Sequence, residues 1–176
     1  IVTGTILLSS PISAETIFFI LEQAKQFEVK IVIDLNWRKV FWDHSSFSSE
    51  ISKVVRENLI KKCLNHANIL KLAKEEANLF FEYENPMLIS QKLSNQPDVI
   101  ITDGKNPVSW YINGMQGITK TPTSQKIVDT TGAGDAFLAG LISKLISSGY
   151  PSNVGEIENC IKFACVCGLL TCLGEG

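Results

Sequence analysis

The amino-acid sequence predicts an α/β fold with a mainly parallel sheet, and two patterns carry this prediction. Residues 31–35 form a β-branched apolar run, which is typical of a strand buried in a parallel sheet. Residues 14–27 instead carry apolar side chains three and four positions apart, the spacing of one helical face. The two patterns alternate along the chain, which favours helices that flank the sheet.

The other elements follow from the same patterns and from turn residues. Asn113-Gly114 is a strong two-residue turn signal and predicts a hairpin, and Pro86 suits the start of a helix. An ordinary polar loop is expected at residues 42–49. Strands are expected at residues 5–8, 31–35, 68–72, 98–102, 108–112 and 116–120. Helices are expected at residues 14–27, 49–64, 74–81, 86–93, 132–147 and 154–173.

The composition indicates one domain that acts on small molecules. The 176 residues are 45% hydrophobic and 19% charged, which suits a single core of ordinary size. A net charge of −2 provides no basic field for nucleic acid or an anionic membrane. No apolar run approaches the roughly 20 residues of a membrane helix, and no repeat or linker divides the chain. We therefore expect neither a nucleic-acid nor a membrane partner.

The cysteines favour buried free thiols over a metal site. Four of the five cysteines crowd into one apolar helical stretch, with the spacing C-x4-C-x-C-x4-C and no paired C-x2-C knuckles. No signal-peptide pattern stands at the start of the sequence. Free thiols fit a reducing compartment, so a cytoplasmic location is expected.

Residues 128–137, VDTTGAGDAF, carry the strongest functional signal. Gly132 and Gly134 lack a Cβ atom, so the backbone can turn sharply and a ligand can approach its N–H groups. Apolar residues at helical spacing follow, so Gly132 to Asp135 should form the first turn of a helix. The unpaired N–H groups and partial positive charge of a helix start make a natural anion site.

Asp135 has two explanations in this turn, because its carboxylate would repel a phosphate. It either balances the helix dipole or accepts a proton from a hydroxyl that attacks phosphorus. Other phosphate motifs are absent from the sequence: no GxxxxGK[ST] string exists, and a GxGxxG fingerprint would need glycine at the position of Phe137. Phosphoryl transfer is therefore the candidate chemistry, with both roles of Asp135 open.

The whole segment closely resembles the D-T-x-G-A-G-D-x-F signature of the PfkB, or ribokinase-like, carbohydrate kinases. The resemblance implies a three-layer α/β/α sandwich with a mainly parallel sheet. It also implies that Gly132, Ala133 and Gly134 form an anion hole for the phosphoryl group of ATP. Asp135 would be the catalytic base that contacts the substrate hydroxyl.

A second motif follows the predicted strand at residues 31–35. The sequence Asp34-Leu35-Asn36-Trp37-Arg38, with a tryptophan four residues later, resembles the D-x-N-x-R…W segment of fructokinase-like and sugar-acid kinases. Ligands of open α/β sheets bind at strand carboxyl ends, so Asn36 and Arg38 are candidate contacts for substrate or phosphate. The alternative is that Asp34 and Asn36 only shape a loop and that Arg38 pairs with a surface acid.

Residues 70–77 resemble the segment with the family's N-x-x-E motif, whose glutamate organises magnesium-bound water. Glu76 matches that glutamate, whereas Ala73 replaces the asparagine. One glutamate acting through water is sufficient for Mg²⁺ beside ATP phosphates. Alternatively, Glu75 and Glu76 only complement a helix dipole.

Two further segments match nucleotide and cation positions. Thr102-Asp103-Gly104 resembles the T-x-G turn that lines the family's nucleotide site, although a plain turn explains it equally well. Asp129 and Thr131 match positions that shape a loop for a monovalent cation such as K⁺ next to the nucleotide, and their oxygens would also suit a helix cap.

The resemblance covers nearly the whole chain but only the later part of a family member. The first strands, the β lid and an early substrate-gripping aspartate have no counterpart. Residues 1–176 are therefore expected to be the C-terminal portion of a PfkB domain, a fragment inactive on its own. The resemblance also implies a homodimer as the candidate state of the full-length protein.

The resulting hypothesis is Mg²⁺-dependent transfer of phosphate from ATP to a primary hydroxyl of a sugar. Fructose is the leading substrate, and a ribose or sugar-acid kinase of the same family is the alternative. A second hypothesis is a catalytically silent nucleotide-binding module, motivated by the absent lid, by Ala73, and by Pro107 in place of an expected glycine. A third, a Rossmann-like dinucleotide domain, is disfavoured by the missing fingerprint.

Overall fold

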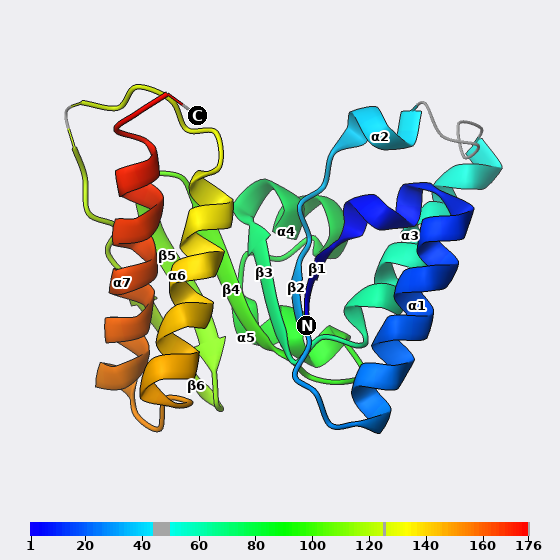
Figure 1. The fold of residues 1–176 in the computed structure, drawn as a ribbon, viewed down its shortest axis with the longest axis horizontal. Coiled ribbons are helices and arrows are strands. Elements are labelled where there is room, and N and C mark those ends of the chain that lie inside the picture. Colours follow the sequence, from blue (N-terminus) through cyan, green and yellow to red (C-terminus); the bar gives the residue numbers. More distant parts are fainter. Residues whose placement is uncertain (44–49, 125, 176) are drawn as a thin grey trace. The chain divides into compact units, whose positions relative to one another are not determined.

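The chain divides into two compact units, Ile1–Ile101 and Thr102–Gly176 (Figure 1). The structure, a computed structural model, describes residues 1–43, 50–124 and 126–175. None of the helices in these ranges is long and apolar enough to cross a bilayer.

The strands of the first unit lie in the order β1-β2-β3-β4. β1 (Val2–Gly4) pairs with β2 (Val32–Asp34), and β2 pairs with β3 (Ile69–Ala73), both in parallel. β4 (Asp98–Asp103) begins beside β3. Every side chain of β2 is buried, as its β-branched run predicts.

Helices connect these strands and contribute buried apolar side chains to the core. Along α1 the buried residues Ala14, Ile17, Leu21 and Ala24 follow the predicted helical spacing. They pack into one core with apolar side chains of β2, β3, α3 and α5. The helices of this unit are α1 (Pro11–Gln26), α2 (Lys39–Asp43), α3 (Glu50–Leu64), α4 (Lys74–Phe81) and α5 (Pro86–Lys92). The predicted helices of this unit are thus confirmed.

The predicted strand at residues 5–8 is wrong. The strand lies earlier, at β1, and a 3-10 helix, η1, follows it at Thr5–Ser9. Thr5 and Leu8 are buried while Leu7 is 48% exposed. A spacing of three residues buries that pair in a 3-10 turn, and the Thr5 hydroxyl also donates to the carbonyl of Leu35 at 2.5 Å.

The loop predicted at residues 42–49 is only partly described. Trp42 belongs to the short helix α2, which the sequence did not predict. Its ring is fully buried and stacks on that of Trp37, so tertiary contacts stabilise this single turn. Residues 44–49 lie outside the described residues.

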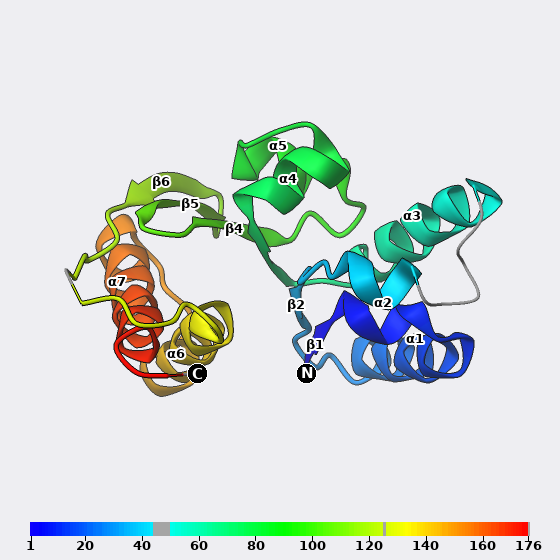
Figure 2. The same ribbon diagram turned by 90° about the horizontal axis from the view of Figure 1, so that it is seen from above.

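The second unit contains the predicted hairpin and two long helices. β5 (Asn106–Ile112) pairs antiparallel with β6 (Met115–Thr119). The turn residues Asn113 and Gly114 have φ of +50° and +75°, the left-handed backbone that this turn requires. α6 (Ala133–Ser148) and α7 (Val154–Thr171) run antiparallel and side by side (Figures 1 and 2).

A close contact fixes the start of α6 against α7. A Cβ atom on Gly168 of α7 would lie 2.9 Å from the carbonyl oxygen of Ala133. A larger residue would therefore push the first turn of α6 away. Because that turn holds the predicted anion site, Gly168 belongs to its support.

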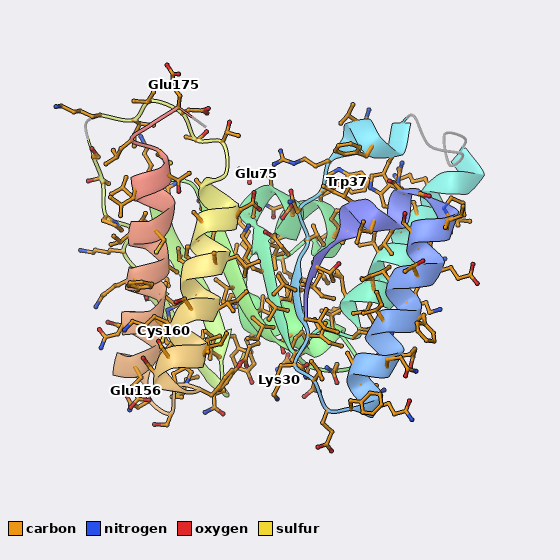
Figure 3. The ribbon with its side chains drawn as sticks, in the orientation of Figure 1. Lys30, Trp37, Glu75, Glu156, Cys160 and Glu175 are labelled. Atoms are coloured by element: carbon orange, nitrogen blue, oxygen red, sulfur yellow. The ribbon has the colours of Figure 1, made fainter. Side chains whose placement is uncertain are left out.

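The cysteines are free thiols. Cys160 lies on α7 (Figure 3), where it is buried together with Cys165, and Cys172 is buried at the C-cap of this helix. In the first unit, burial raises the pKa of the Cys63 thiol to about 12, so this cysteine stays protonated. Within the described residues, no group of three His, Cys, Asp or Glu side chains could hold a metal ion.

Candidate functional site

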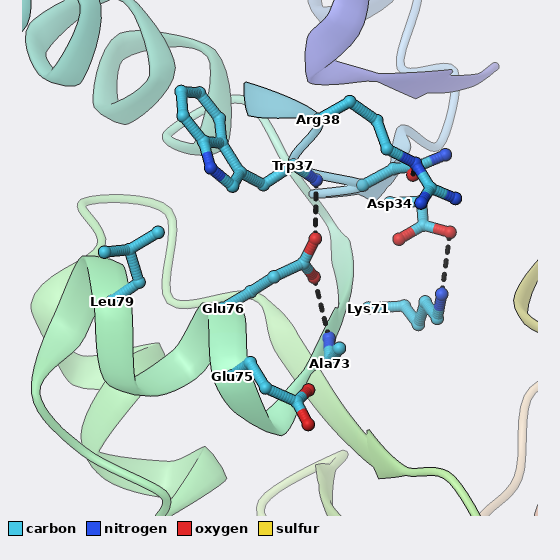
Figure 4. A pocket seen from close by; sticks show the side chains of 9 residues that line it. Asp34, Trp37, Arg38, Lys71, Ala73, Glu75, Glu76 and Leu79 are labelled. Atoms are coloured by element: carbon cyan, nitrogen blue, oxygen red, sulfur yellow. Dashed lines mark hydrogen bonds and ion pairs between the residues drawn. The ribbon is translucent and has the colours of Figure 1, made fainter. Parts of the chain in front are cut away.

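Polar side chains at the ends of β2 and β3 line a pocket of about 330 Å³ in the first unit (Figure 4). Because the two strands are parallel, their carboxyl ends lie at the same edge of the sheet. Asn36, Arg38 and Glu76, which come from two separate motifs, all line this pocket. The structure therefore brings together the substrate and magnesium candidates of the first unit. We call this cavity the β2–β3 pocket.

A buried ion pair forms part of the pocket wall. Lys71 Nζ lies 2.8 Å from Asp34 Oδ2, and each side chain is only 8% exposed. The two residues are partners in the register of β2 and β3, so the sheet itself sets their distance. Lys71 is not among the residues predicted from the sequence, although a lysine inside the apolar strand at residues 68–72 indicates a buried partner.

Glu76 is engaged through both carboxylate oxygens. Oε1 accepts the N–H of Trp37 at 2.5 Å, and Oε2 accepts the N–H of Ala73 at 2.7 Å. Burial raises the pKa of Glu76, while these two hydrogen bonds act in the opposite direction. A carboxylate has about four acceptor positions, so Glu76 keeps acceptor positions beyond these two bonds.

The loop after β2 is anchored by its tryptophan. The Trp37 ring stacks on Trp42 with centroids 5.6 Å apart and meets the edge of Phe80 at 5.3 Å. Asn36 and Arg38 flank this tryptophan. Asn36 has a left-handed φ of +41°, and its Oδ1 accepts a hydrogen bond from Arg38 Nε at 3.1 Å. Asn36 and Arg38 therefore order one another as well as line the pocket.

Helix α4 begins at the same pocket without a polar cap. Ala73 occupies the N-cap position, and its methyl group cannot accept a hydrogen bond from the helix. Glu76 supplies only the returning half of a capping box, through the Ala73 N–H. The replacement of the motif's asparagine by alanine thus costs this chain a cap.

We expect Ala73→Ser to raise the free energy of unfolding by about 1 kcal/mol, because the hydroxyl would accept an N–H of the first turn of α4. Urea denaturation measures the change. Asn153→Ala is the matched control, since Asn153 caps α7 by accepting the N–H of Glu156 at 3.0 Å, and its loss should cost a similar amount. An unchanged or lowered stability of Ala73→Ser would contradict the missing cap.

A second cavity, of about 530 Å³, lies within the second unit. Thr102 and Gly104 line it together with Ala133 and Gly134. It thus brings the two nucleotide motifs of this unit to one place. The rest of its wall is largely apolar, with side chains of Val108, Ile127, Phe137, Cys165, Leu169 and Cys172. We call it the α6 pocket.

The start of α6 has the predicted sharp turn. Gly132 is the N-cap in a left-handed conformation, with φ of +76°, which suits glycine. Asp129 Oδ1 accepts both the N–H and the hydroxyl of Thr131, at 2.9 and 2.8 Å. The Ala133 N–H is directed to the carbonyl of Thr130 at 3.2 Å. The Ala133 N–H is therefore already bonded in this structure. The N–H groups of the first turn that can bind an anion directly are those that follow Ala133.

The predicted residues of the second unit do not all share the α6 pocket. Thr130 lines it, whereas Thr131 is bound to Asp129. Asp135 stands in the first turn of α6 with an exposed carboxylate. An exposed carboxylate is accessible to a substrate hydroxyl, and its place in the first turn also complements the helix dipole.

Known proteins resemble this chain over almost its whole length. Residues 1–176 match the model of the pfkB family carbohydrate kinases. Fructokinases from Salmonella typhimurium and Klebsiella pneumoniae are each 28% identical over 98% of this chain and 54% of their own length. The chain thus spans about half the length of these relatives.

Solved structures show the same fold. A fructokinase from Xylella fastidiosa with bound ATP has a TM-score of 0.84 at 21% identity, over 99% of this chain and 55% of its own. A fructokinase from Vibrio cholerae O395, bound to fructose, ADP and calcium, has a TM-score of 0.79 at 25% identity, over 99% and 55%. These matches confirm the predicted ribokinase-like α/β fold. The chain therefore belongs to the pfkB family of carbohydrate kinases.

Proposed function

We propose that this chain belongs to an ATP-dependent kinase that phosphorylates a primary hydroxyl of a sugar, most readily fructose. The observation that carries the proposal is the start of α6. Gly132 is the left-handed N-cap of α6, and the first residues of this helix, Ala133 and Gly134, line the α6 pocket. The next residue, Asp135, is exposed. A helix start holds an anion, and an adjacent carboxylate can act as a base.

Each predicted residue has a role in this proposal. Asp135 accepts the proton of the sugar hydroxyl as its oxygen bonds to phosphorus. The N–H groups at Gly132 to Gly134 hold the phosphoryl oxygens, and the Ala133 N–H joins them by leaving the Thr130 carbonyl. The apolar wall of the α6 pocket suits a planar base, with Thr102, Gly104 and Thr131 beside the nucleotide. Asn36 and Arg38 contact the substrate in the β2–β3 pocket.

Metal ions assist at two places in the proposal. When bound, Mg²⁺ supplies positive charge that neutralises the phosphate oxygens. Glu76 would hold a water of that ion on its remaining acceptor positions. Asp129 shapes a loop with Thr131 that suits a monovalent cation such as K⁺.

A substrate panel on the full-length protein tests the proposal. With ATP and Mg²⁺ present, we expect sugar-dependent ADP release with the highest kcat/KM for fructose. A higher value for ribose or a sugar acid would reassign the substrate within the family. ATP binding without ADP release for any sugar would favour the silent nucleotide-binding module. A cytoplasmic location and a homodimeric full-length protein belong to the same proposal.

A further inference from the structure

Glu76 joins two loops that are far apart in the sequence. Its carboxylate accepts the N–H of Trp37 in the loop after β2 and the N–H of Ala73 where β3 ends (Figure 4). Both oxygens are used, one for each loop. The side chain is half-buried, so water competes less with these bonds than it would on an exposed carboxylate.

The loop after β2 is held at its start by Leu35, whose N–H donates to the Lys71 carbonyl and whose carbonyl accepts the Thr5 hydroxyl. Asn36 holds a left-handed φ of +41°, a conformation that costs energy outside glycine even though asparagine tolerates it best. Arg38 is exposed and contacts Asn36 within the same loop. The Trp37 ring fixes the loop laterally, through Trp42 and Phe80. Among the described residues, Glu76 is the acceptor of the Trp37 N–H, so this hydrogen bond fixes the Trp37 backbone.

We propose that Glu76 is a positioning residue, which fastens the loop that carries Asn36 and Arg38 to the start of α4 and so sets the affinity for the sugar. We call the two hydrogen bonds of Glu76, to the N–H groups of Trp37 and Ala73, the latch. The role in sugar affinity rests on the proposed function, whereas the latch itself does not. It is also distinct from the magnesium role of Glu76, because it acts in the protein without metal or nucleotide. A charge-assisted bond to a backbone N–H is among the stronger hydrogen bonds in proteins.

Amide hydrogen exchange tests the latch directly. We compare the full-length protein with its Glu76→Gln variant, in EDTA and without substrates, resolving single residues by NMR. Glutamine has one acceptor oxygen in place of two and presents a donor to the second N–H. We expect the exchange of the Trp37 N–H, the Ala73 N–H or both to rise by about tenfold or more, with no change in the amides of α1.

Glu75→Gln is the matched control. Glu75 lines the same pocket and precedes Glu76 in the same helical turn, but its carboxylate is exposed and is joined to neither N–H. The control removes the same charge and should leave both amides protected. If Glu76→Gln does not fold, Glu76→Asp carries the test, because its shorter side chain can reach only one of the two N–H groups.

Kinetics then separate the latch from the magnesium role. We expect Glu76→Asp, which keeps the charge, to raise the KM for the sugar by about tenfold, with a smaller change in kcat and in the Mg²⁺ dependence. Unchanged exchange at Trp37 and Ala73, or an equal rise over the whole chain, would overturn the latch. Faster exchange with an unchanged sugar KM would overturn its role in substrate affinity. Absence of kinase activity in the unmodified protein would instead overturn the proposed function and leave the exchange result standing.

Discussion

Asp135→Asn should lower kcat of the full-length protein by about 10²- to 10⁴-fold, the usual contribution of a positioned general base. Asparagine has nearly the same size but cannot take the proton of an attacking hydroxyl. The first turn of α6 and the α6 pocket should keep their shape, because the Asp135 side chain is exposed. ATP affinity should therefore change little. Steady-state kinetics with the best sugar of the panel, together with calorimetric ATP binding, check both expectations.

A second acid in a first helical turn provides the control for Asp135. Glu156 stands in the first turn of α7 and accepts the N–H of Ser152 at 2.8 Å. Glu156→Gln removes an interaction with a helix dipole in the same way, yet kcat should not change. If Asp135 only balances the dipole, its asparagine variant should lose about 0.3–1 kcal/mol of stability and keep near-normal turnover. That result would contradict the assignment of Asp135 as the base.

The helices were predictable because their apolar spacing survives in the fold. α1 buries Ala14, Ile17, Leu21 and Ala24 at helical spacing. The segments that could not be predicted take their structure from distant partners. The turn at Thr5 is tied to the Leu35 carbonyl, thirty residues on, and α2 depends on the stacking of Trp42 on Trp37. The pattern of neighbouring residues in the sequence does not predict contacts with such distant residues.

The same distinction applies to the candidate site. The sequence predicts the chemistry that we propose for the α6 turn, because the glycines, the acid and the helical run are contiguous. It also predicts Asn36 and Glu76 as site residues. It does not predict the hydrogen bond that Glu76 accepts from Trp37, the residue after Asn36. The ion pair of Lys71 with Asp34 escapes prediction for a related reason, since strand register brings the two together.

Lys71→Met should lower the free energy of unfolding by about 3–5 kcal/mol, because it removes the cation 2.8 Å from a carboxylate that is 8% exposed. The loss measures the cost of a buried charge deprived of its counter-charge, not the net value of the pair. The double variant Asp34→Leu/Lys71→Met should therefore recover most of the stability, since an apolar pair of similar volume often replaces a buried ion pair without cost. Urea denaturation of both variants measures the difference.

Lys162→Met separates burial from distance as the cause. Lys162 lies 2.9 Å from Glu158, nearly the same distance as in the buried pair, but the two side chains are 55% and 36% exposed. Water screens such a pair, so its loss should cost only about 0–1 kcal/mol. If Lys71→Met lowered the free energy of unfolding no more than Lys162→Met, burial would not make the Asp34 carboxylate depend on its counter-charge. If the double variant were as unstable as Lys71→Met alone, the loss would lie in the shape of the β2–β3 pocket rather than in its charge.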